Sequence, residues 1–138
     1  MFEYHGWLVI RAAPHETDTD HRDVHAAADF LKGLVEEDAE APGLRDLRWV
    51  NGSPQYHFGG FRNRSDGVYR SALKSVELVL ERAPGSYGMI YYWDDEDPVH
   101  PNEFKVLVVR RGQITEHADT FLSPVVPTIE DPYQPEES

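Results

Sequence analysis

Two histidines, His21 and His25, stand four positions apart in a segment with helical periodicity. This spacing places both imidazoles on one face of a helix, where they could begin a zinc site. A zinc centre needs further ligands, and only His15, Asp18 and Asp20 lie nearby, in a loop that would have to fold back. The His-Glu-x-x-His pattern of metalloproteases is not present, because its glutamate is missing. A solvated helix face is the favoured interpretation, a metal site is the weaker alternative, and no cofactor is predicted.

A run of acids forms the second candidate site. It directly follows the apolar segment Tyr87–Trp93 and comprises Asp94, Asp95, Glu96 and Asp97. Their carboxylates should project from the end of a sheet, where their mutual repulsion costs stability unless a cation or a basic partner relieves it. The run lacks the alternating ligands and central glycine of a calcium loop. A solvated loop, a basic protein partner and a divalent metal remain open, and the basic partner is the preferred functional interpretation.

The sequence shows no pattern that predicts catalysis. We find no nucleophile elbow, no phosphate-binding loop and no serine–histidine pair in a recognisable context. Nothing selects a general acid and a general base from the 25 acidic residues. The lack of cysteine excludes thiol nucleophiles, disulfides and cysteine-ligated metals. We therefore expect a protein that is not an enzyme.

Charge and size narrow the function further. The 13 basic and 25 acidic residues give a net charge of −12, which repels a phosphate backbone and argues against direct binding of nucleic acid. A chain of 138 residues that is 40% hydrophobic can bury a core within one domain. We expect a domain over residues 1–131 and a short acidic C-terminal tail over residues 132–138. The start of the chain lacks a signal-peptide pattern, and no apolar run could cross a membrane, so we expect a cytoplasmic protein without a membrane partner.

Hydrophobic periodicity predicts the elements that position these residues. Alternating and turn-bounded segments predict strands near residues 2–11, 44–50, 55–64, 87–93, 104–110 and 113–117. Amphipathic stripes predict helices near residues 20–38 and 65–83. The order is βαββαβββ. The predicted fold class is α+β, with a mainly antiparallel sheet and both helices packed on one face.

Aromatic residues gather on the predicted strands, and most of them must belong to the core. Because both helices need the same sheet face, alternation should leave some of four aromatic side chains on the other face. These candidates are Trp49, Tyr56, Tyr92 and Trp93. Exposed aromatics beside acids are typical of protein-binding surfaces. Alternatively, the segment Leu122–Ile129 or a second copy of the chain covers them, so a monomer and a homodimer both remain open.

Four blocks of the sequence resemble one known family, the immunity protein 7 family of bacterial polymorphic toxin systems. The blocks are Phe2-Glu3-Tyr4-His5-Gly6-Trp7, the Tyr87-Gly88 strand with its acidic end, the Phe104–Gly112 strand and turn, and Leu122-Ser123-Pro124-Val125-Val126-Pro127-Thr128-Ile129-Glu130-Asp131. They occur in the family's order and span nearly the whole chain.

The resemblance implies a small α+β antidote that binds and occludes a cognate toxin domain in the producing bacterium. The acidic charge favours a nuclease as that toxin, because nucleases present basic clefts to phosphate. The candidate toxin-binding residues are those of the acidic run together with the four aromatics. Two other classes stay open: an acidic module with another basic target, and a metal-dependent hydrolase.

Overall fold

The structure is a computed structural model that describes residues 1–13 and 20–129. Six strands are seen in this part of the chain: β1 (Phe2–Val9), β2 (Leu44–Val50), β3 (Ser53–Arg62), β4 (Tyr87–Asp94), β5 (Phe104–Arg110) and β6 (Gln113–Ala118). The same part contains the helices α1 (Asp20–Glu37), α2 (Gly67–Arg82) and the short α3 (Val125–Thr128). The predicted α+β class and element order are confirmed, with α3 added after the last strand.

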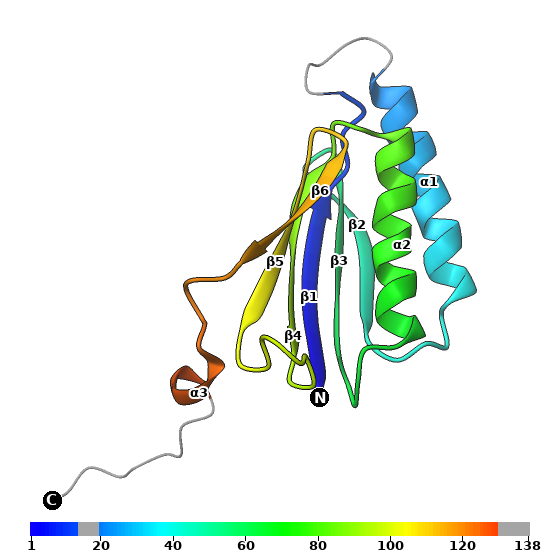
Figure 1. Ribbon diagram of the computed structural model, residues 1–138. Helices are drawn as coiled ribbons and strands as arrows, with labels where there is room; N and C mark the ends of the chain where they lie inside the picture. Colours follow the sequence, from blue (N-terminus) through cyan, green and yellow to red (C-terminus); the bar gives the residue numbers. More distant parts are fainter. Residues whose placement is uncertain (14–19, 130–138) are drawn as a thin grey trace, which may run out of the picture.

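The strands form one antiparallel sheet in the order β2-β3-β1-β4-β5-β6. Helices α1 and α2 lie on one face, and the segment that carries α3 leaves the sheet on the other side (Figure 1). Strand β1 lies between β3 and β4, and its burial pattern shows which face the helices cover. Phe2, Tyr4 and Leu8 are buried, while His5 between them is exposed. Alternation along a strand sends these two sets to opposite faces. We call the face without α1 and α2 the open face.

Helix α2 is defined by its cap and its apolar stripe. The Asp66 carboxylate accepts a hydrogen bond of 3.0 Å from the Val68 amide and so satisfies one of the free donors at the helix start. Ala72, Val76 and Val79 recur at helical spacing and are buried against the sheet. The turn at Pro84-Gly85 then returns the chain to β4.

The β2–β3 connection is tighter than the sequence indicates. The strands predicted near residues 44–50 and 55–64 leave residues 51–54 as their connection, but Ser53 and Pro54 already belong to β3. The turn consists of Asn51 and Gly52, both at positive φ (51° and 83°). Two such residues favour a type I′ turn, which matches the twist of the paired strands. Trp49 therefore lies opposite Pro54 in the ladder.

A polar network ties β2 to both helices. The Arg45 guanidinium donates to the Asp38 carboxylate at 2.7 Å, to the Ser75 hydroxyl at 2.7 Å and to the Tyr56 hydroxyl at 2.8 Å. Ser71 donates to the same carboxylate, and its hydroxyl together with Arg45 lowers the pKa of Asp38. Because Arg45 is mostly buried, these contacts satisfy its donors where water does not reach freely.

Within residues 1–13 and 20–129, the helices are too short or too polar for any of them to cross a bilayer.

Candidate functional site

The acidic run begins at Asp94, the last residue of β4, and continues into the loop between β4 and β5, next to the start of β1. The Asp97 carboxylate accepts hydrogen bonds of 2.9 Å from the amides of His100 and Val99, and Lys105 Nζ approaches it at 3.3 Å. These bonds lower the pKa of Asp97 to about 2. Asp97 thus shapes the loop, and its charge is compensated within the chain.

The remaining acids of the run divide into two kinds. Asp94 closes the turn, because its carboxylate accepts a hydrogen bond of 3.0 Å from the Glu96 amide. The Asp95 amide donates to the Met1 carbonyl at 3.2 Å, which holds the loop against β1, and its carboxylate contacts the Met1 amino group. The side chains of Asp95 and Glu96 are exposed. Of the four carboxylates that the sequence places at the sheet end, these two are the more exposed to a partner, although the Asp95 carboxylate is already paired with the Met1 amino group.

Three of the four candidate aromatics lie on the helix side of the sheet. Tyr56 is fully buried beneath the helices, opposite Leu8 in the ladder. Tyr92 lies opposite Tyr4, and its hydroxyl donates to the Glu116 carboxylate. Trp49 packs against α1, where its ring stacks on the His25 ring at 4.4 Å. We expected some of the four aromatics on the face without helices, and these three are not among them, because the register with β1 and the tight β2–β3 turn set their faces.

Trp93 is the one candidate on the open face, and a segment of the same chain covers it. Only 6% of Trp93 is exposed, because Val125 packs on it together with Phe104. The indole Nε1 donates to the Pro101 carbonyl at 2.9 Å. The expected cover by the segment Leu122–Ile129 is thus seen at this end of the open face, and Trp93 is not free to contact a partner.

His21 and His25 contact each other, and His25 contacts the aromatic side chain of Trp49. The rings of His21 and His25 lie 4.5 Å apart in an edge-to-face arrangement, and His25 also stacks on Trp49. His15 and Asp18, suggested as further ligands, lie outside the described residues, and the Asp20 side chain is not described either. In the part of the chain that the structure describes, no three His, Cys, Asp or Glu side chains converge as a metal would require.

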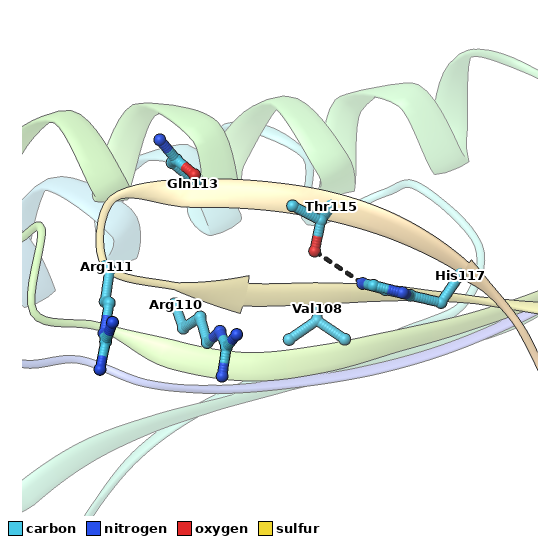
Figure 2. Close-up of a pocket in the computed structure, with 6 residues that line it drawn as sticks. All are labelled: Val108, Arg110, Arg111, Gln113, Thr115 and His117. Atoms are coloured by element: carbon cyan, nitrogen blue, oxygen red, sulfur yellow. Dashed lines mark hydrogen bonds between the residues drawn. The ribbon is translucent and has the colours of Figure 1, made fainter.

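Two hollows on the open face were not predicted from the sequence. The first, of about 410 Å³, lies where the C-terminal segment crosses the sheet and is lined mainly by apolar side chains: Tyr91, Phe104, Phe121, Leu122 and Ile129, with Glu3, His5 and Asp119. The second, of about 470 Å³, lies on the β5–β6 hairpin (Figure 2). It is lined by Val108, Arg110, Arg111, Gln113, Thr115 and His117. We call this second hollow the hairpin groove.

The hairpin groove has a signal in the sequence that could have revealed it. Gln113, Thr115 and His117 alternate along β6, so their side chains share one face of the sheet. Arg110 lies opposite Gln113 in the ladder, and Val108 lies opposite Thr115. A net charge of −12 describes the whole chain and hides such a local concentration of basic side chains.

Comparison with known proteins identifies the family. The family model for immunity protein 7 matches residues 1–131, so the chain belongs to the immunity protein 7 family. Searches of the curated proteins and of the solved structures returned no match to this chain.

Proposed function

We propose that this protein is an immunity protein that binds the toxin domain of a polymorphic toxin system and occludes its active site in the producing bacterium. The observation that carries the proposal is the family match over residues 1–131. Inhibition by occlusion needs a rigid surface and no reaction of its own. The antiparallel sheet with its two packed helices supplies such a surface.

The charge of the chain supports a basic toxin, and among toxin activities it favours a nuclease. A net charge of −12 attracts a basic protein over a distance of about a Debye length and raises the rate of encounter. A nuclease cleft must attract phosphate, so it presents the positive potential that complements this field.

A binding titration tests the proposal. The toxin domain encoded next to this chain is expected to bind with a dissociation constant below 1 μM, as cognate complexes of standard interface size do. The measurement is calorimetric titration combined with a toxin activity assay, and an unrelated toxin domain of similar charge serves as the control. Equal binding of both domains, or no saturable binding at micromolar concentration, contradicts the proposal.

The exposed acids of the β4–β5 loop give a second, kinetic prediction. Replacing Asp95 with Asn and Glu96 with Gln is expected to slow association by about three- to tenfold at low salt and to flatten its salt dependence, because steering charges act mainly on the association rate. The matched control replaces Glu36 and Glu37, two exposed acids of α1, with Gln. Both variants change the net charge by the same amount. Stopped-flow association at two salt concentrations compares them, and equal rates for both variants would place the approach surface away from the loop.

A further inference from the structure

Positive charge is concentrated on the open face beside the β5–β6 hairpin, although the chain as a whole is acidic. Arg110 and Arg111 are both exposed, and Figure 2 shows that their side chains extend to the same side of the hairpin. His117 lines the same groove further along β6 and contacts the Thr115 hydroxyl at 2.8 Å.

The two arginines lack a partner among the described residues, as Arg64 and Arg70 also do, whereas three other arginines are paired. Arg45, Arg48 and Arg62 each pair with an aspartate within 3 Å. No ion pair or hydrogen bond from the guanidinium groups of Arg110 and Arg111 is seen within residues 1–13 and 20–129. Without such a partner, the two guanidinium groups are available to a ligand. Their planar set of donors matches a carboxylate, so they suit an acidic ligand.

The strand beside the groove is also available. β6 is the last strand of the sheet order and pairs only with β5 within the described chain. Its outer edge presents backbone donors and acceptors that an extended segment of another protein can pair with. Five of its six residues are exposed. Edge and groove together fit an extended peptide with acidic side chains better than a compact ligand.

The apolar hollow adjoins the hairpin groove on the same face and adds area for contact with a partner. Val106 lies opposite both Tyr91 and His117 in the ladder, so it joins the wall of one hollow to the wall of the other. Phe121, at the rim of the apolar hollow, is 90% exposed. A stable interface takes about 800 Å² from each partner. The hairpin groove consists of a few side chains, so it reaches that area only together with the adjoining apolar hollow.

We propose that the hairpin groove and the outer edge of β6 receive an extended acidic segment of the toxin by strand addition, with apolar side chains of the toxin seated against Phe121. This inference rests on the proposed function and deepens it by naming the docking surface. The overall negative field brings a basic toxin close, and the local positive charge of the groove then selects one segment and one register. A nucleic acid is the less fitting ligand, because the net charge of −12 repels its backbone.

Charge reversal with a matched control tests the surface. The double variant Arg110→Glu, Arg111→Glu changes the net charge from −12 to −16, since two positive charges are lost and two negative charges are gained. The control, Arg22→Glu with Arg70→Glu, makes the same change on exposed positions of α1 and α2. Both variants therefore carry the same net charge. The groove variant is expected to bind the adjacent-gene toxin domain about 100-fold more weakly, mainly through faster dissociation, and the control to stay within about threefold of the unmodified protein.

Thermal unfolding of both variants without toxin confirms that each is folded, and Arg110→Gln with Arg111→Asn replaces the groove variant if reversal prevents folding.

Hydrogen exchange in the complex is expected to show slower exchange for the β6 amides. Equal dissociation constants for the groove variant and the control, or unprotected β6 amides, overturn the inference while leaving the proposed function intact. Binding of a labelled 20-nucleotide single strand that is lost in the groove variant also overturns it. An unmodified protein that does not bind the toxin domain removes the proposed function and this inference with it.

Discussion

Alanine in place of Gly88 is expected to lower the free energy of unfolding by about 4 kcal/mol or more, the range of severe single substitutions. Gly88 lies in β4, between Leu8 of β1 and Val109 of β5. A Cβ atom at this position would stand 1.9 Å from the Trp7 carbonyl oxygen and 2.9 Å from the Leu8 Cα. Both are backbone atoms, so the clash is relieved only by separating β1 from β4 in the middle of the sheet.

Gly33→Ala is the matched control for this prediction. Gly33 lies inside α1, and apart from its chain neighbours and the backbone of α1 itself, no heavy atom of the described chain stands within 4 Å of the Cβ that alanine would add. The same change is expected to stabilise the protein by about 0.5–1 kcal/mol, because alanine restricts the unfolded chain and favours helix. Urea denaturation followed by circular dichroism measures both variants. A Gly88→Ala protein within about 1 kcal/mol of the unmodified one would show that the β1–β4 pairing is looser than the structure indicates.

The main elements could be predicted because each rests on local patterning. β1 alternates over eight residues with a large apolar side chain at Phe2, Tyr4 and Leu8, and this period predicts the strand and places these three side chains on one face. α2 combines an N-cap aspartate, a stripe at helical spacing and a Pro-Gly stop. Agreement among such local signals is what makes an element predictable from one sequence.

The faces of the aromatic residues could not be predicted, because they depend on register between distant strands. Periodicity fixes which residues of one strand share a face, but not which of the two faces meets the helices. Tyr56 and Trp93 illustrate the point. Tyr56 is buried because it lies opposite Leu8 in β1, and Trp93 is buried because Val125, far along the chain, lies on it.

The sequence predicted the acidic charge of the run at the end of β4, but not which of its carboxylates are held within the fold. Four adjacent acids suggest four exposed carboxylates, yet Asp97 uses its oxygens to cap the amides of Val99 and His100. An aspartate that accepts from amides two and three residues later is a local pattern, and it could have marked Asp97 as part of the loop scaffold. The hairpin groove stayed hidden because averaging over the chain subtracts its arginines from a larger number of acids.

The C-terminal segment of the described chain is expected to be a structural cover. Its first turn is held by the Asp119 carboxylate, which accepts from the amides of Phe121 and Leu122 at 3.1 and 2.8 Å. Further along, the Asn102 side chain both donates to and accepts from the backbone of Val126 at 2.8 Å. Between these two anchors Val125 is fully buried on Trp93 and Phe104. The contacts are those of a packed segment.

Neighbouring valines provide an internal control for this cover. Val125→Asp is expected to lower the free energy of unfolding by about 3 kcal/mol, because it removes a buried apolar side chain and places a carboxylate without a partner against Trp93. Val126→Asp is expected to change it by no more than about 0.5 kcal/mol, because Val126 is 47% exposed. Thermal and urea unfolding without toxin measure both, and equal losses would mean that burial of Val125 is not what stabilises this end of the sheet.

Truncation separates a cover from a binding surface. A chain that ends after Phe121 loses Val125 and the Asn102 contacts, and we expect its unfolding temperature to fall as far as that of Val125→Asp or further. Removal of residues 132–138 alone, the expected acidic tail, is the control and should leave the unfolding temperature unchanged. Unchanged stability of the shorter chain with loss of toxin inhibition would instead make the segment part of the toxin contact. Full stability together with full inhibition would mean that the open face needs no cover, since its aromatic residues would then tolerate water without a measurable cost in free energy.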